Sequence, residues 1–155
     1  MTLPLVTPEL QALIGAEWPA VVYEVDRPGI RMWANAVGID DPVFHDEAEA
    51  RARGFARLPA PSGFMGVPRR MPSDPEPGPP IRGLHPDLGR SLNGGTEFEF
   101  HLPVMAGDEL VATSTITDLK ERSGSLGRML VITRETTFRR DGETVALLRA
   151  TVINY

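Results

Sequence analysis

Hydrophobic and polar residues alternate through the second half of the chain. Phe98 and Phe100 alternate with polar residues in TEFEFHLPV, and three longer β-branched runs follow: LVATSTITDL, RMLVITRETTFRR and ETVALLRATVINY. This alternation predicts four strands, and the turns at MAGDEL, SGSLG and Asp141-Gly142 predict that consecutive strands pair antiparallel. No helical segment separates these strands, which disfavours a parallel sheet of the Rossmann type.

The first half of the chain predicts one strand and short helices. Residues 20–26 (AVVYEVD) have the composition and the alternation of a strand. Pro28 opens a helix that Gly38 ends, and Asp46 caps a second helix that Gly54 ends.

Glycine and proline interrupt the middle of the chain. Residues 62–71 predict a central helix that is broken by Gly63, Gly66 and Pro68. Residues 72–92 are too rich in Pro and Gly for regular structure and predict a flexible loop. We therefore expect residues 1–155 to form a single α+β domain, with helices packed on one face of an antiparallel sheet.

Composition narrows the possible functions. A chain of 155 residues with 41% hydrophobic residues can bury a core, and its net charge of −5 disfavours a general nucleic-acid-binding surface. It has no apolar run long enough to span a membrane and begins without the pattern of a secretory signal. The absence of cysteine excludes disulfides and thiolate chemistry and fits a cytoplasmic protein, which we expect.

Three segments resemble, in this order, the MaoC-like hydratase/dehydratase family. They are GIDDPVFHDEAEARARGF at residues 38–55, LPAPSGF at residues 58–64 and FEFHLPVMAGDELVATSTI at residues 98–116. The resemblance covers about residues 18–155 and is nearest to the family's N-terminal type, the fatty-acid-synthase-like dehydratase region. It implies a hot-dog fold, in which a curved antiparallel sheet of five to six strands packs on a long central helix, here interrupted. It also implies a homo- or heterodimer with a similar subunit.

Active members of this family carry the pattern Gly-Asp-x-Asn-Pro-Leu-His, whose Asp and His hold the water that adds to a 2-enoyl thioester. Both groups must reach one water at about 3 Å, so they lie on one bent segment. Aligned on Pro42, this chain has Ile39 at the Asp position and Phe44 at the His position. Neither side chain can transfer a proton. The resemblance therefore implies that this chain lacks the intact catalytic motif.

Asp40 and His45 lie one residue beyond these two positions, and a locally shifted segment would present them as the catalytic pair. His45 directly precedes the capping Asp46, however, which favours a helix-entry role for it. Asp40 and Asp41 precede Pro42 as residues of a plain turn do. We favour the structural role for each and keep Asp40 and His45 as catalytic candidates.

In this family, backbone N–H groups at the start of the central helix polarise the thioester carbonyl as an oxyanion hole does. The resemblance places this substrate-binding role at Ser62, Gly63 and Phe64, because Pro61 has no N–H. An equal alternative is that Gly63 and the neighbouring prolines only shape the loop.

The remaining polar candidates carry less weight. His85 and His101 lack the spacing of metal ligands, and three histidines without cysteine do not predict a metal site. Asn93-Gly94-Gly95 lacks the strand-then-helix context of a phosphate-binding loop. The arginines that flank the loop are read mainly as solvated charge, with coenzyme A phosphates or an acidic carrier protein as alternative partners; they are Arg69, Arg70, Arg82 and Arg90.

We therefore expect a subunit of an enoyl-thioester hydratase, equivalently a 3-hydroxyacyl-thioester dehydratase, whose catalytic Asp and His come from a partner. The ligand would be a thioester of coenzyme A or of acyl carrier protein, and no cofactor is expected. Two alternatives stay open: a self-contained homodimeric enoyl-CoA hydratase that uses Asp40 and His45, and a non-enzymatic acyl-CoA-binding hot-dog module. A thioesterase is disfavoured because residues 62–71 contain no acidic side chain.

Overall fold

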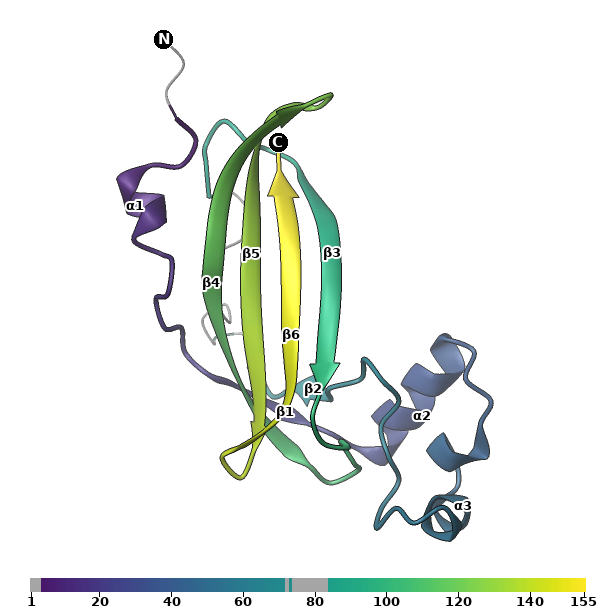
Figure 1. Ribbon diagram of the computed structural model, residues 1–155. Helices are drawn as coiled ribbons and strands as arrows, with labels where there is room; N and C mark the ends of the chain where they lie inside the picture. Colours follow the sequence, from purple (N-terminus) through teal and green to yellow (C-terminus); the bar gives the residue numbers. More distant parts are fainter. Residues whose placement is uncertain (1–3, 72, 74–83) are drawn as a thin grey trace.

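The computed structural model describes residues 4–71, 73 and 84–155, and its main feature is one curled antiparallel sheet (Figure 1). The strands run in the order β2-β1-β4-β5-β6-β3. Their bounds are β1 Val21–Glu24, β2 Val67–Pro68, β3 Ser91–Phe100, β4 Glu109–Gly124, β5 Gly127–Arg140 and β6 Glu143–Asn154. The predicted α+β class with a curved sheet of five to six strands is confirmed.

The four strands predicted in the second half of the chain form β3 to β6. β4, β5 and β6 pair as consecutive antiparallel hairpins, and β3 joins the sheet next to β6. The hairpin between β5 and β6 turns at Asp141 and Gly142, whose φ angles of 50° and 83° are those of a type I′ turn. Asp141 and Gly142, which predicted this hairpin, therefore supply the positive φ angles that its turn requires.

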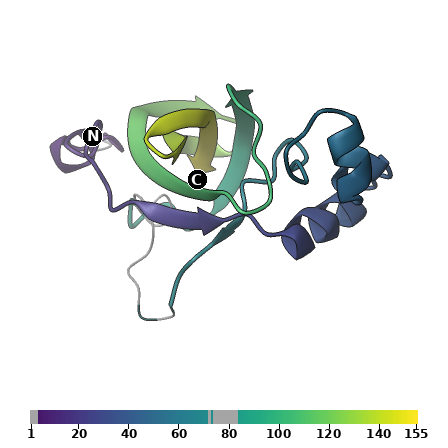
Figure 2. The ribbon, with the colours of Figure 1, turned by 90° about the horizontal axis from the view of Figure 1, so that it is seen from below.

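Four short helical segments lie beside the sheet: α1 Pro8–Gln11, α2 Arg27–Ala36, η1 Pro42–Phe44 and α3 Glu47–Ala52. The Oδ1 atom of Asp26 accepts the N–H of Gly29 at 2.7 Å, and that of Asp46 accepts the N–H of Ala48 at 2.7 Å. These two side chains satisfy N–H groups that the first turns of α2 and α3 leave unpaired. Figure 2 shows α2 and α3 to one side of the curled sheet.

The predicted central helix over residues 62–71 is wrong. This segment forms a turn at residues 62–63 and then the short strand β2, which pairs with β1. Gly63 and Gly66 have φ angles of 94° and 91°, which a right-handed helix does not contain. A Cβ atom on Gly66 would lie 2.6 Å from the carbonyl oxygen of Glu24, so only glycine fits at this position.

The predicted loop over residues 72–92 extends two residues too far at its C-terminal end, because Ser91 and Leu92 already belong to β3. Residues 72 and 74–83, where Pro and Gly are densest, lie outside the described residues.

Buried hydrophobic residues form two clusters. The helical-end cluster joins α2 and α3 to one end of the sheet; it includes Ile30, Ala50, Leu58, Phe64, Leu110 and Phe138. The hairpin-end cluster lies toward the β4–β5 turn, and it consists of Leu5, Leu10, Leu88, Ile116, Leu119, Leu130 and Ile132. Burial of apolar surface in both clusters is the main source of stability for the fold.

A buried carboxylate ties the ends of the strands together. Asp108, 5% exposed, accepts hydrogen bonds from Arg57 Nη2 and Arg140 Nη1, each at 2.7 Å, and from the N–H of Met105 at 2.9 Å. Arg57 also donates to the carbonyl oxygen of Ala106 at 2.7 Å. Segments that are far apart in the sequence therefore meet at one side chain.

Replacing Asp108 with alanine is predicted to destabilise the fold by roughly 3 kcal/mol, because two guanidinium groups and one buried N–H lose their acceptor. Urea unfolding followed by circular dichroism measures the change. Glu109→Ala, which removes the next carboxylate from an exposed position, is the matched control and should shift the urea midpoint little. Equal midpoints for the two variants would show that Asp108 does not have this role.

Candidate functional site

A pocket opens between residues 60–64 and the chain that follows β3. It encloses about 310 Å³, which suits a small organic group. The lining residues are Ala60, Pro61, Ser62, Phe64, Phe100, His101, Leu102, Pro103 and Val104. The substrate-binding candidates Ser62 and Phe64 thus line one pocket, with Gly63 between them in the chain.

The wall formed by residues 61–64 is a type II turn. The N–H of Phe64 donates to the carbonyl oxygen of Pro61 at 3.0 Å, and Gly63 at the third position has a φ of 94°. The N–H groups of Ser62 and Gly63 make no hydrogen bond within the described part of the chain. The turn therefore leaves two backbone donors beside the pocket, although no helix begins there.

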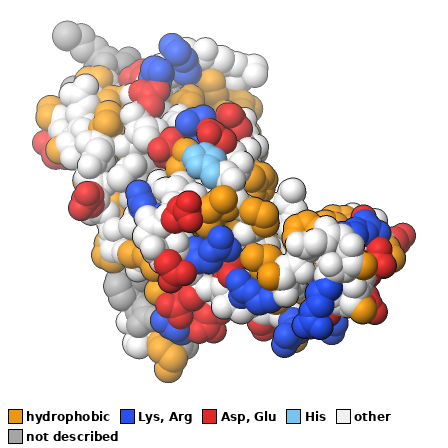
Figure 3. Space-filling view, turned by 60° about the horizontal axis from the view of Figure 1, so that its bottom comes forward, with side chains coloured by type: hydrophobic (Ala, Val, Ile, Leu, Met, Phe, Trp, Pro, Cys, Tyr) orange, Lys and Arg blue, Asp and Glu red, His pale blue; other side chains and the backbone are white. Residues whose placement is uncertain are grey.

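Aromatic packing supports this turn from behind. Phe64 is 7% exposed, and its ring lies 5.8 Å from that of Trp33 on α2. A Cβ atom on Gly29 would lie 2.8 Å from the ring of Phe64, so α2 approaches it closely only because residue 29 is glycine. In Figure 3, hydrophobic side chains gather where the helical part meets the sheet, while acidic and basic side chains are mixed elsewhere on that face.

The sequence did not single out His101, which lines the pocket. His101 follows the end of β3, and its Nε2 atom lies 2.9 Å from Oε1 of Glu99 on that strand. The alternation of side chains predicted that Glu99 and His101 share one face. It could not predict the pocket, because the opposite wall is formed by residues 60–64, about 40 positions earlier in the chain.

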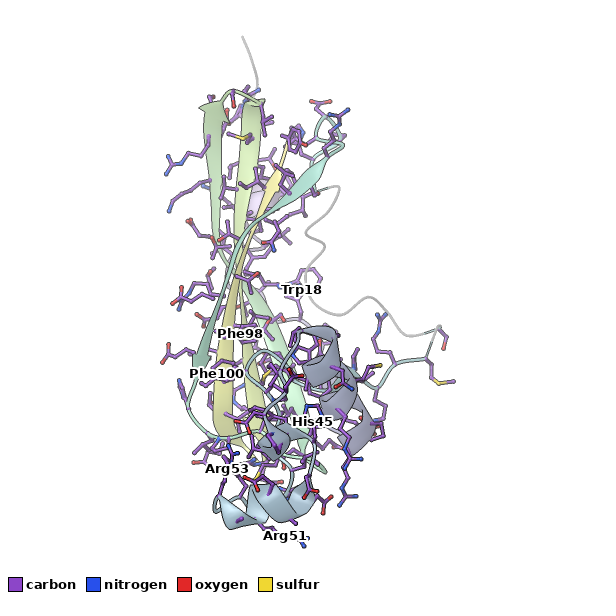
Figure 4. The ribbon with its side chains drawn as sticks, turned by 90° about the vertical axis from the view of Figure 1, so that its right-hand side faces the viewer. Trp18, His45, Arg51, Arg53, Phe98 and Phe100 are labelled. Carbon is purple, nitrogen blue, oxygen red and sulfur yellow. The ribbon has the colours of Figure 1, made fainter. Side chains whose placement is uncertain are left out.

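Residues 38–45, which the sequence aligned with the family's catalytic motif, lie in the helical part, and neither Asp40 nor His45 lines the pocket. The Nε2–H of His45 donates to the carbonyl oxygen of Ile39 at 2.8 Å, which folds the ring back onto its own loop. Asp40 is exposed, and its carboxylate makes no hydrogen bond or ion pair with any described residue. Phe44 packs against the helical-end cluster. In Figure 4, His45 is seen among the helices and Phe98 on the sheet.

Asp41 stabilises the conformation of the loop that contains Pro42. Its carboxylate accepts the N–H of Val43 at 3.1 Å and pairs with Arg53 at 2.9 Å. Arg31 also holds the loop, because its Nε atom donates to the carbonyl oxygen of His45 at 3.0 Å. These contacts give Asp41 and the backbone of His45 structural partners, whereas Asp40 has none among the described residues.

Other candidates from the sequence do not gather into a site. Arg69 pairs with Glu24 at 2.9 Å and with Glu109 at 3.0 Å, as expected of solvated charge, whereas Arg82 lies outside the described residues. Across residues 4–71, 73 and 84–155, no three His, Cys, Asp or Glu side chains come together as metal ligands. None of the helices in this part of the chain is long and apolar enough to cross a membrane.

The family model of the FAS1-like dehydratase domain region matches residues 12–148. The chain belongs to this family. A UPF0336 protein of Streptomyces avermitilis is 36% identical over 116 residues, which cover 74% of this chain and 76% of that protein.

Solved structures agree with the family. The C-terminally truncated HadBC (3R-hydroxyacyl-ACP dehydratase) complex of Mycobacterium tuberculosis matches with a TM-score of 0.66 and 25% identity, over 91% of this chain and 96% of the matched chain. A MaoC-like dehydratase matches with a TM-score of 0.71 and 28% identity, over 93% of this chain and 42% of its own. The MaoC-like resemblance and the hot-dog fold are confirmed, whereas the roles of Asp40, His45, Ser62, Gly63 and Phe64 stay predictions.

The structural role of Asp41 predicts a pH dependence. The N–H of Val43, and then Arg53, lower the pKa of Asp41 below its ordinary value. A lowered pKa stabilises the folded chain above the pKa of the unfolded state, and this stabilisation is lost as the pH falls through the folded-state value. We predict that Asp41→Asn is less stable than the wild type at pH 6, and that the difference between their urea midpoints shrinks below about pH 4.

The matched control is Asp40→Asn, which alters an exposed carboxylate without a described partner and should shift the midpoint little at either pH. A difference for Asp41→Asn that persists unchanged at low pH would contradict the assignment.

Proposed function

We propose that this chain is a subunit of an enoyl-thioester hydratase, equivalently a 3-hydroxyacyl-thioester dehydratase, and that it shapes the acyl pocket while a partner supplies the catalytic Asp and His. One observation carries the proposal. The turn beside the pocket has two backbone N–H groups, of Ser62 and Gly63, without a partner among the described residues, but Ile39 and Phe44 occupy the positions of the family's acid and base.

Binding of a thioester uses the turn at residues 61–64. The N–H groups of Ser62 and Gly63 donate to the thioester carbonyl oxygen, which gains negative charge as water adds to the neighbouring double bond. Phe64 and Phe100 provide apolar contact for the first carbons of the acyl group. Because residues 62–71 form no helix, the wall of the pocket is a loop, and this suits a bulky or long acyl chain.

Proton transfer needs an acid and a base at the pocket, and residues 39–45 place neither group there. Ile39 and Phe44 cannot exchange a proton, and the hydrogen bond from His45 to Ile39 engages the ring within its own loop. A general acid or base must come within hydrogen-bond reach of the reacting atoms. A second subunit with an intact Asp and His meets this requirement.

The partner is proposed to bind at the edge of the sheet formed by β3. Among the described strands β3 pairs with β6 alone, and nine of its ten residues are exposed. Leu92 is 43% exposed and Phe100 is 44% exposed, so the edge offers both apolar side chains and unpaired backbone groups. The similarity to a HadBC chain, which is part of a complex, supports a heterodimer.

The purified chain alone is predicted to hydrate crotonyl-CoA or 2-decenoyl-CoA at least about 100-fold more slowly than its complex with a MaoC-like subunit that carries the intact motif. The loss of enoyl absorbance measures the rate. Robust activity of the lone chain that His45→Ala abolishes would overturn the proposal and would support the self-contained hydratase with Asp40 and His45.

Leu92→Lys tests the partner surface, because it places a charge on the exposed edge of β3. The variant should lose the tagged partner in co-purification and lose the gain in hydration rate. Leu126→Lys is the matched control, since Leu126 is a 50% exposed leucine at the β4–β5 turn and should retain both. Equal partner retention by the two variants would place the interface elsewhere.

A further inference from the structure

The inner face of the sheet carries a cation between the two hydrophobic clusters. Along β5, the side chains of Ile132, Thr136 and Phe138 are buried on this face, and strand alternation places Arg134 with them. Arg134 stands opposite Ile116 on β4 and Ala150 on β6. A charged side chain therefore lies on a face that is mostly apolar and also carries the buried Thr136.

Arg134 has no acceptor for its buried donor. Its Nε atom is removed from solvent without a hydrogen-bond partner, and Arg134 makes no ion pair within the described part of the chain. The carboxylate that faces inward farther along the sheet, that of Glu121, is already paired with Arg128 at 2.8 Å. A buried N–H without an acceptor costs free energy, and no described residue supplies an acceptor for this one.

A second buried donor without a partner among the described residues lies on the segment that precedes β1. The indole Nε1 of Trp18 is also buried without a partner. Trp18 lies between Gly15, whose N–H donates to the carbonyl oxygen of Ile116 at 2.9 Å, and Val21, which pairs with Ala112. Figure 4 shows Trp18 beside the middle of the sheet, on the side where the helices lie. The segment that carries Trp18 thus runs along β4 between Ile116, which faces Arg134, and Ala112.

Both unpaired groups are donors, so the missing partner is an acceptor, and the charge of Arg134 favours an anion. A carboxylate matches the forked donors of a guanidinium. Apolar side chains flank this layer, with Ile116 and Ile132 on one side and the half-buried Phe98 and Leu148 on the other, beside the hydrogen-bonded hydroxyls of Ser114 and Thr136. We propose that Arg134 and Trp18 form a binding site for the carboxylate of a ligand with a hydrocarbon body.

This site does not depend on the thioester function proposed above. Two ligands would present the same chemistry: a free fatty acid, or an acyl thioester with a second carboxylate at its far end. Neither ligand needs the catalytic motif or the partner subunit to bind, so the site can be tested on the purified chain.

The test measures binding through the fluorescence of Trp18 in a Trp33→Phe background. Dodecanoate, below its micelle concentration, should bind at least tenfold more tightly than dodecanol, because only the acid can pair with the guanidinium. Arg134→Met should weaken dodecanoate at least tenfold and leave dodecanol unchanged. Arg122→Met changes an exposed arginine elsewhere on the sheet and should leave both affinities unchanged.

Equal binding of acid and alcohol, or equal binding of dodecanoate by the wild type and Arg134→Met, overturns the proposal. So does an absence of saturable binding together with a higher melting temperature of Arg134→Met, since that result means the arginine binds only water. A destabilised Arg134→Met is replaced by Arg134→Lys, which keeps the charge without the fork and should weaken dodecanoate less than fivefold.

Two thioesters separate the sources of the carboxylate and keep this proposal apart from the thioester function. If the mono-CoA thioester of dodecanedioic acid depends on Arg134 and dodecanoyl-CoA does not, the carboxylate belongs to the far end of an acyl thioester. If dodecanoate depends on Arg134 and neither thioester binds, the site takes free fatty acids and the thioester function is wrong. If both thioesters bind without regard to Arg134 and dodecanoate does too, the thioester function stands and this site does not.

Discussion

The hydrogen bonds of Asp108 hold the two walls of the pocket in place. Arg57 leads into the turn at residues 61–64, and Met105 follows the wall at residues 100–104; both donate to the buried carboxylate. Backbone bonds continue this contact, from Ala60 to Val104 at 2.7 Å and from Ala106 to Leu58 at 2.8 Å. The carboxylate is shielded from water, so its interactions are stronger than those of a surface pair. Without it, only these backbone bonds would hold the turn at residues 61–64 against the chain that follows β3.

The sequence predicted the sheet well because strand pairing follows local patterns. Alternation of side chains marked β3 to β6, and Asp141-Gly142 marked a hairpin whose positive φ angles suit these residues. The helix expected over residues 62–71 failed because Gly63 and Gly66 take left-handed φ angles that a helix excludes. The same glycines were expected only to interrupt the helix, whereas the structure has none there.

The site was only partly predictable. Ser62, Gly63 and Phe64 could be chosen from the resemblance, and two of them line the pocket. His101 was missed because its place depends on the approach of residues 60–64, which Asp108 and Arg57 bring about from distant positions. The donor pair of Trp18 and Arg134 was hidden for the same reason, since burial without a partner is a property of three-dimensional packing. In the account proposed here, pocket and proton transfer are divided between two chains.

The most direct test of this account is nuclear magnetic resonance of the backbone amides of the lone chain, titrated with decanoyl-CoA, a saturated thioester that cannot be hydrated. The account predicts saturable shifts that are largest at Ser62, Gly63 and Phe64, with Asp40 and His45 unaffected. Unchanged amides at residues 62–64, with shifts centred on Asp40 and His45, would contradict it.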